Sequence, residues 1–344
     1  MRKVLTVGVF LNAAFLFAIW QQLSVVAEVG GGALVSPCDT DQTKYSLDTN
    51  DDGGIDLSDF VFGLSWFFQG TEAPRLCLAT TDLEVRLAAL EGGGLPISGF
   101  TFVETNAQDY PEYTQDSSGI RFVRLPGGSF NMGSPTSEAG HNADEGPVHT
   151  ASLSAFLIAK YEVTQAEYEA VMTNPPAGLS ATPSSATGDD LPVETVSWND
   201  LHVVDGFLER TGLSLPSEAQ WEYACRAGTP GPYAGTGNLD DMGWYDSNSS
   251  NLTHDVGTKQ PNQFGLHDLH GNVLEWCGDI YKSDFYSDEV PGFDPLSPSG
   301  SANRVIRGCG FGNPAAFCRS ARRFNVPAVL QFGSTGFRPV RQLP

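Results

Sequence analysis

The C-terminal end of this chain is basic, although the chain as a whole is strongly acidic. From Arg304 to Pro344 there are seven arginines and no acidic residue, whereas all 344 residues together carry a formal charge of −22. Burying an unpaired guanidinium is costly, so we expect these arginines to pair with carboxylates from elsewhere in the chain. The alternative is an exposed anion-binding face. Pairing would require the fold to bring distant acidic segments onto the C-terminal one.

The composition indicates a globular body with many loops. Hydrophobic residues make up 40% of the chain and include 21 Phe and 6 Trp, while 38 Gly and 22 Pro favour turns. Short apolar segments separated by Gly, Pro, Asn and Ser predict a mixed α+β domain with long irregular connections. The negative charge would repel phosphates, which argues against sequence-independent binding to nucleic acid or anionic lipid.

The N-terminus has the pattern of an export signal. Arg2 and Lys3 precede an apolar run over residues 4–20, and the small residues up to Ala27 offer a cleavage site. We therefore expect residues 1–27 to be a signal peptide and the protein to be secreted, periplasmic or on the cell surface. An uncleaved membrane anchor is the alternative, because no charge lies between Lys3 and Glu28.

A small calcium-loop module is predicted at residues 37–77. Within it, residues 48–59 place oxygen-bearing side chains and a turn glycine at EF-hand-like spacing. The expected ligands are Asp48, Asn50, Asp52, Gly54 and Asp59. The loop resembles that of bacterial dockerin modules, although dockerins carry two such loops and this chain has one; the alternative is an acidic surface turn. Of the possible disulfides, Cys38–Cys77 would bracket this module.

Residues 78–95 are predicted to be a linker that contains a short helix. Leu83, Leu87 and Leu90 recur at helical spacing before the glycines at 92–94. Residues 86–91 resemble a trimerisation pattern of parallel coiled coils, which would make the protein an oligomer. A helix of this length is not stable alone, so a linker helix that packs on its neighbours is the alternative.

Three helices are predicted in the remaining two thirds of the chain. Thr164–Glu167 is a capping box that begins a helix to about Met172, and Ser217–Gln220 begins another that Gly228 ends. Between them, residues 199–210 place four apolar side chains on one side of a third helix. These are Leu201, Val204, Phe207 and Leu208.

Several segments of this large domain carry a family resemblance. Two of them are residues 264–276 and 304–308, the second followed by Cys-Arg-Ser-Ala at 318–321. The others are residues 126–134, 145–149, 161–164, 192–198 and 215–224. In this order they resemble the formylglycine-generating enzyme family, also called sulfatase-modifying factors. The resemblance covers residues 96–344 and implies a variant of the C-type-lectin-like fold.

The resemblance also implies a structural calcium site. The matching positions supply two carboxylates and two backbone carbonyls, which are the hard oxygen ligands that calcium prefers. They are Asp268, Gly271, Val273 and Glu275. We interpret His267 and His270, in the same stretch, as loop residues, because no third nitrogen or thiolate ligand for a soft metal lies nearby in the sequence.

The copper site of the family's oxidases is incomplete in this sequence. Those enzymes hold Cu⁺ between two cysteines, and the downstream one matches Cys318, but Asn313 stands at the upstream position. Soft Cu⁺ requires thiolate ligands, which an amide does not replace. Two further family residues differ: Gly310 replaces the active-site serine, and Leu274 replaces a tryptophan.

Cys309 offers three alternatives at this point. It could form a new two-thiolate copper site with Cys318, a disulfide with Cys318, or it could be a separate structural thiol. The spacing of nine residues, in place of five, would require a different strand register for copper.

Two functions follow. The first is an exported, calcium-stabilised module that binds a protein or glycan at a surface formed by Asn313, Arg319 and Arg322. The second is a copper-dependent oxidase, with Cys318 catalytic, that converts a sulfatase cysteine to formylglycine. An oxidase needs two reduced thiols in one cleft, whereas a binding module does not.

Overall fold

The computed structural model describes residues 95–287 and 292–343, which belong to the second of the two units into which the chain divides, Gly94–Pro344. The predicted signal peptide, calcium loop, Cys38–Cys77 pair and linker helix therefore lie outside the described residues. No helix in the described part of the chain is long and apolar enough to cross a membrane.

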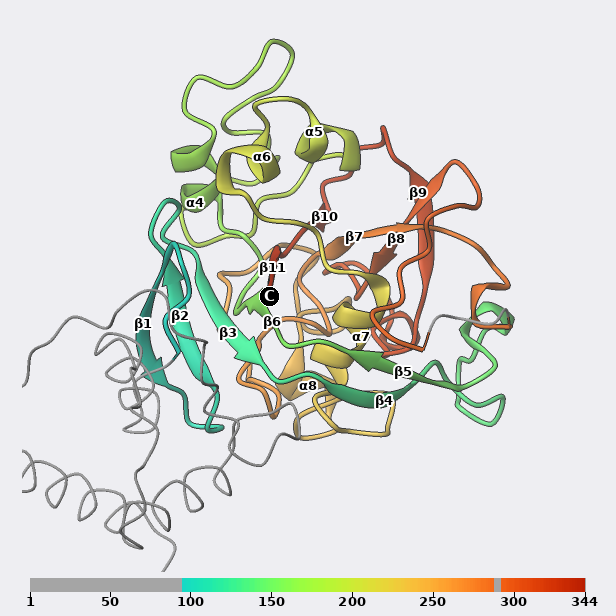
Figure 1. The fold of residues 1–344 in the computed structure, drawn as a ribbon. Helices are drawn as coiled ribbons and strands as arrows, with labels where there is room; N and C mark the ends of the chain where they lie inside the picture. Colours follow the sequence, from blue (N-terminus) through green and yellow to red (C-terminus); the bar gives the residue numbers. More distant parts are fainter. Residues whose placement is uncertain (1–94, 288–291, 344) are drawn as a thin grey trace, which may run out of the picture. The chain divides into compact units, whose positions relative to one another are not determined.

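One antiparallel sheet of five strands ties the C-terminus to the start of the domain (Figure 1). Its order is β1 (Phe100–Thr105), β2 (Pro111–Gln115), β3 (Arg121–Leu125), β6 (Phe156–Ala159) and β11 (Val340–Gln342). All four residues of β6 are buried, as a short continuous apolar run between two neighbouring strands predicts. Its pairing with β11 places the C-terminal segment beside the core.

A second sheet of four strands carries the surface described below. Its order is β10 (Thr335–Gly336), β7 (Leu274–Ile280), β8 (Asn303–Arg307) and β9 (Phe324–Pro327). β10 runs parallel to β7, and the other neighbours are antiparallel. A separate hairpin pairs β4 (Gly128–Met132) with β5 (His149–Leu153).

The helices are short, and α7 (Glu218–Arg226) is the most buried of those described, with all nine residues inside the protein. It contacts β4, β5, β7 and β8, and therefore links the hairpin to the four-stranded sheet (Figure 1). The others are α4 (Gln165–Val171), α5 (Trp198–His202), α6 (Phe207–Thr211), α8 (Leu239–Met242), η1 (Ala143–Glu145), η2 (Phe285–Ser287) and η3 (Ala315–Phe317).

Both predicted capping boxes are confirmed. At α4 the Glu167 backbone N–H donates to the Thr164 hydroxyl at 3.2 Å, and the Glu167 carboxylate accepts from the Thr164 backbone at 2.9 Å. Ser217 and Gln220 form the same pair of bonds at α7. These contacts span only three residues, so the local sequence is enough to specify them.

The single helix predicted over residues 199–210 is wrong. The chain forms α5 and α6 with a break between them, and Asp205 at the break has a left-handed φ of 59°. Val204, which the pattern placed on the buried face, is 83% exposed. Gly206 is the N-cap residue of α6. A β-carbon at this position would lie only 2.8 Å from the Val203 carbonyl oxygen, so the break favours glycine.

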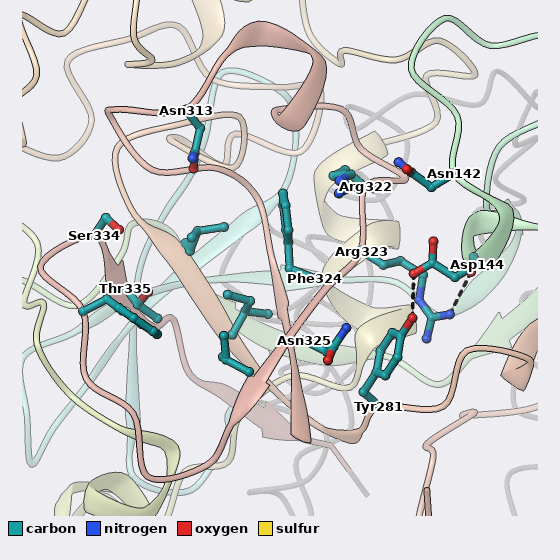
Figure 2. A pocket seen from close by; sticks show the side chains of 14 residues that line it. Asn142, Asp144, Tyr281, Asn313, Arg322, Arg323, Phe324, Asn325, Ser334 and Thr335 are labelled. Atoms are coloured by element: carbon teal, nitrogen blue, oxygen red, sulfur yellow. Dashed lines mark hydrogen bonds between the residues drawn. The ribbon is translucent and has the colours of Figure 1, made fainter. Parts of the chain in front are cut away.

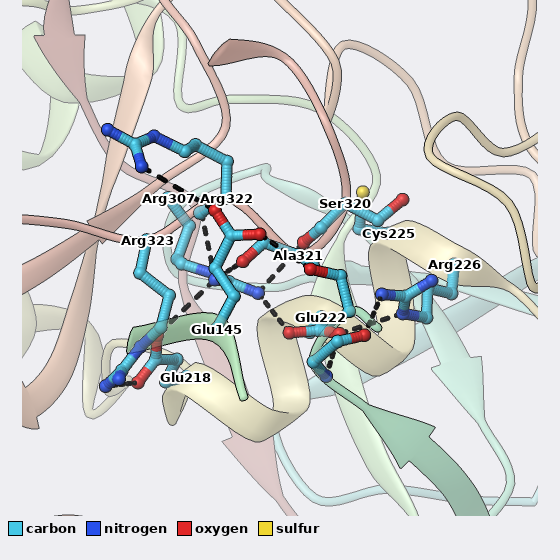
Figure 3. Close-up of polar contacts among 12 residues, drawn as sticks. Glu145, Glu218, Glu222, Cys225, Arg226, Arg307, Ser320, Ala321, Arg322 and Arg323 are labelled. Atoms are coloured by element: carbon cyan, nitrogen blue, oxygen red, sulfur yellow. Dashed lines mark hydrogen bonds and ion pairs between the residues drawn. The ribbon is translucent and has the colours of Figure 1, made fainter. Parts of the chain in front are cut away.

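The predicted pairing of the C-terminal arginines is confirmed for five of the seven. Figure 3 shows Arg307, Arg322 and Arg323 with their acidic partners. Their partners come from earlier parts of the chain. The pairs are Arg307 with Glu218 and Glu222, Arg319 with Glu138 and Glu145, Arg322 with Glu145, Arg323 with Glu218, and Arg338 with Glu275. Acidic residues of α7 and of the η1 loop thus hold the C-terminal segment in place.

Candidate functional site

A cleft of about 540 Å³ opens over one face of the four-stranded sheet (Figure 2). Residues that are paired across a sheet share a face. Thr335 is paired with Leu274, and Ile306 is paired with Phe324, and these four residues lie on the face below the cleft. With Val326 and Phe332 they line the cleft. The floor is therefore mainly apolar, and Thr335 lies at its β10 edge.

The rim of the cleft is polar. Tyr281 donates its hydroxyl to the Asp144 carboxylate at 2.9 Å, and Arg323 donates to the Asp144 carbonyl at 2.8 Å. Figure 2 shows this group on one side of Phe324 and Ser334 and Thr335 on the other. Asn142, Asn313 and Asn325 complete the polar lining. An occupant would thus meet apolar side chains below and hydrogen-bonding groups around its edge.

Arg322 is the most available charged group of this lining. It stacks on Phe324, with its guanidinium carbon 4.5 Å from the ring centre, and its nearest carboxylate oxygen, on Glu145, is 3.6 Å away. Its Nε is buried and has no hydrogen-bond partner among the described residues. By contrast, Arg323 donates two hydrogen bonds to Glu218.

Asn313 lines the cleft, but its side-chain oxygen already accepts a hydrogen bond. That oxygen accepts from the Gly310 backbone N–H at 2.8 Å, and the Asn313 carbonyl accepts from the Asp246 backbone at 3.1 Å. The amide therefore holds the 310–313 turn. Arg319 does not belong to the predicted ligand surface: it is 1% exposed and donates to Glu138 and Glu145.

Cys318 and Cys309 form a disulfide with Cα atoms 4.8 Å apart, one of the three alternatives left open by the sequence. Both residues are fully buried, and neither lines the cleft. The two free cysteines of the described residues, Cys225 and Cys277, are buried as well. Burial raises the pKa of Cys225 to about 12 and that of Cys277 well above its ordinary value. These donors do not fit a two-thiolate copper site.

His270 holds the backbone next to this disulfide. Its Nε2 accepts from the Ala234 backbone N–H at 2.9 Å, so Nδ1 carries the proton that is donated to the Cys318 carbonyl at 2.8 Å. Burial lowers the pKa of His270 to about 4, which keeps the ring neutral. The interpretation of His270 as a loop residue is confirmed.

The predicted calcium ligands Asp268 and Glu275 lie in one buried acidic group. One Asp268 carboxylate oxygen accepts from the Gly257 backbone at 2.7 Å, and the other is buried with no hydrogen-bond partner in the described part of the chain. Both Glu275 oxygens accept from Arg338 at 2.7 Å, and one also accepts from Trp221. The unpartnered oxygen suits a hard cation, whereas a cation at Glu275 would compete with Arg338.

Glu162 joins this acidic group, and the ligand prediction missed it. Its carboxylate accepts from the Val273 backbone at 3.0 Å and from Asn272 at 2.8 Å. Burial, together with the charges of Asp268 and Glu275, raises the pKa of Glu162 well above its ordinary value. Burial likewise raises the pKa of Asp268 to about 6. The available signal was the matching segment at residues 161–164.

Within residues 95–287 and 292–343, no three His, Cys, Asp or Glu side chains form a group that could hold a metal ion. The predicted calcium set is of another kind, because it combines two carboxylates with the backbone carbonyls of Gly271 and Val273. The set remains a prediction.

The sequence has clear relatives. The family described as sulfatase-modifying factor enzyme 1-like domain matches residues 106–343. The formylglycine-generating enzyme of Streptomyces coelicolor is 32% identical over 280 residues, which cover 63% of this chain and 87% of that protein. The enzyme of the same name from Thermomonospora curvata is 28% identical over 295 residues, covering 67% and 96% of the two chains.

A solved structure shares the fold. PvdO from Pseudomonas aeruginosa superimposes with a TM-score of 0.60 at 28% sequence identity. The match covers 72% of this chain and 100% of that one. The fold class predicted from the sequence, an α+β variant of the C-type-lectin-like architecture, is confirmed by these similarities and by the sheets described above.

Proposed function

Because the chain belongs to the sulfatase-modifying factor enzyme 1-like family, we propose that this member uses the inherited cleft to bind a segment of a partner protein without oxidising it. One observation carries the proposal. Cys318 is joined to Cys309, and Asn313 stands where the family's oxidases have their upstream cysteine, so no free thiol lines the cleft among the described residues.

The cleft itself supports binding. Its floor offers apolar area to an incoming side chain, and its rim offers amide, hydroxyl and guanidinium groups to a peptide backbone. The proposed role is therefore recognition or assembly, for which the two-thiol geometry is not required.

Export and calcium binding are part of the same proposal. A disulfide persists in an oxidising compartment, so the Cys309–Cys318 bond supports the export predicted from Arg2, Lys3 and the apolar run that follows. Calcium would be held by the 48–59 loop and by the Asp268 group, where an unpartnered carboxylate oxygen supports it.

The second candidate function is a copper-dependent oxidase that acts on a sulfatase cysteine. The 32% identity to an enzyme named for formylglycine generation favours it. In this chain it would require reduction of the Cys309–Cys318 disulfide and a thiolate pair in a new arrangement.

One assay separates the two functions. The full chain, supplied with Cu⁺, reductant and oxygen, is incubated with a Cys-x-Pro-x-Arg peptide, and mass spectrometry follows conversion of the thiol to an aldehyde. We expect no aldehyde, while the Streptomyces coelicolor enzyme as control produces it. An aldehyde that disappears in the Cys318→Ser variant would overturn the binding proposal.

A further inference from the structure

Thr335 leaves a hydrogen-bonding group unused at the edge of the cleft. The residue is fully buried, and its hydroxyl oxygen has no partner among the described residues. A buried hydroxyl without a partner is destabilising, and most such groups in native proteins are satisfied. Because Thr335 pairs with Leu274 across the sheet, the residue lies beside the apolar floor, although its hydroxyl oxygen is buried beneath the cleft surface.

Arg322, which stacks on Phe324 at the margin of the floor, is the charged side chain of the cleft with the weakest ion pair. Three charged side chains line the cleft, namely Asp144, Arg322 and Arg323. Asp144 accepts from Tyr281, and Arg323 donates to Glu218, so both have close partners. Arg322 has only a contact of 3.6 Å to a Glu145 oxygen.

That Glu145 oxygen is already occupied. It accepts from Asn142 at 2.9 Å and from Arg319 at 2.8 Å. A guanidinium carries five N–H donors in a planar fork that matches a carboxylate. Arg322 thus presents a cation with free donors, stacked on Phe324 at the margin of the apolar floor.

We propose that the cleft selects a protein segment in which one acidic side chain lies next to an aliphatic or aromatic one. This deepens the proposed binding function and rests on it. The carboxylate pairs with Arg322, and the apolar side chain covers Leu274 and Phe324. Charge complementarity limits the acidic side chains to one, because Asp144 lines the same cleft and the chain carries a net charge of −22.

Leu274 determines how much space the apolar floor of the cleft leaves for a ligand side chain. It is half-buried at the start of β7, with Ile306 and Phe324 on the same face. A tryptophan at this position would extend over the floor and occupy the space assigned to the ligand's apolar side chain. The residue that departs from the family's pattern is thus the one that makes room.

The test is selection of peptides by the full chain. A phage-displayed library of random seven-residue peptides is panned against the immobilised protein, and enriched sequences are read. We expect enriched peptides to carry Asp or Glu within two positions of Leu, Ile, Val, Phe or Met. A synthetic peptide from this set is then compared with its Gln-substituted and Lys-substituted versions by fluorescence anisotropy.

Variants assign the two contacts. Arg322→Gln is expected to weaken binding about tenfold, the effect of one charge-assisted contact, and to abolish the preference for Glu over Gln. Leu274→Trp is expected to abolish binding of the selected peptide, because the tryptophan would occupy the space of the peptide's apolar side chain. Thermal unfolding of this variant should remain cooperative. Arg341→Gln is the matched control, since Arg341 is exposed and donates to the Gly212 carbonyl outside the cleft lining.

Each failure has a distinct meaning. Enriched peptides without an acidic residue, or with a Glu-over-Gln preference that survives Arg322→Gln, overturn this inference alone. A library that yields no enriched peptide contradicts both the inference and the binding proposal. Aldehyde formation in the oxidase assay contradicts the proposed function instead. If Leu274→Trp does not fold, the Glu-over-Gln comparison in Arg322→Gln still decides the question.

Discussion

Cys309 and Cys318 are joined by a disulfide that closes the loop carrying Asn313 to the cleft. Within that loop the Asn313 side chain accepts from the Gly310 backbone, and His270 donates to the Cys318 carbonyl from outside it. The loop is therefore held by a covalent bond and by hydrogen bonds of its own chain. Its shape requires no metal ion at Asn313.

The disulfide is expected to contribute measurably to stability. Cys318→Ala should lower the free energy of unfolding by about 2–3 kcal/mol, because a cross-link over a short loop removes conformational entropy mainly from the unfolded state. Urea unfolding at pH 7 without reductant measures the change. Cys277→Ala is the control, since it removes a buried thiol but no cross-link; equal effects of the two variants would argue against a stabilising role for the bond.

Glu145 is expected to make the domain sensitive to acid. Burial by itself would raise the pKa of this carboxyl, but hydrogen bonds from Arg319, Asn142 and Ser134 outweigh it and lower the pKa to about 2. A depressed pKa in the folded state means that the contribution is complete above the ordinary value of 4.5 and is lost as the pH falls toward 2.

The measurement is the free energy of unfolding of Glu145→Gln and of the native chain between pH 2 and pH 7. The variant should be less stable at pH 7 by about 3–5 kcal/mol, because Arg319 loses a buried partner. The difference should shrink below pH 4.5. Glu104→Gln, at an exposed pair with Arg121, should change stability by less than about 1 kcal/mol. A constant difference across the pH range would contradict the assignment.

Calcium is expected to stabilise the large domain through Asp268. Removing calcium with EGTA should lower the melting temperature of the native chain, because a cation would satisfy the buried carboxylate oxygen for which residues 95–287 and 292–343 offer no partner. Asp268→Asn should reduce this calcium-dependent shift. An unchanged shift in Asp268→Asn would remove Asp268 from the site.

The sequence-predicted loop calls for a separate readout. Asp48→Ala should reduce the calcium-dependent protection of residues 38–77 from protease without altering the effect of Asp268→Asn. Unchanged protection would contradict the calcium-loop prediction.

Restoring the family's thiol pair is expected to create copper affinity. The double variant Asn313→Cys with Cys309→Gly frees Cys318 from its disulfide and places a second thiol at the upstream family position. Two thiolates suit Cu⁺, so this variant should compete with a Cu⁺ chelator such as bathocuproine disulfonate, whereas the native chain should not. Equal Cu⁺ retention by the native chain and the variant would show that Asn313 is no obstacle to copper.

Local and family patterns in the sequence were enough to predict the fold class, the helix caps and the pairing of the C-terminal arginines. The capping boxes at Thr164 and Ser217 were predictable because their contacts lie within three residues. The pairing of C-terminal arginines was predictable as a class, since buried guanidinium groups need counter-charges, but not that Arg307 would meet α7. The break at Asp205–Gly206 was missed because apolar periodicity continued through it.

Only the tertiary structure decided what lines the cleft and how the cysteines pair. Leu274, Ile306 and Phe324 come from three strands, and their common face depends on sheet register, which no single segment of sequence contains. The same applies to Cys309 and Cys318. Whether they form a copper site, a disulfide or separate thiols depends on the distance between their backbones, which the sequence does not give. The sequence by itself determined the family and the absence of the upstream cysteine. Long-range packing determined the disulfide and the unused groups of Thr335 and Arg322, because these depend on distances between residues that the chain order leaves open.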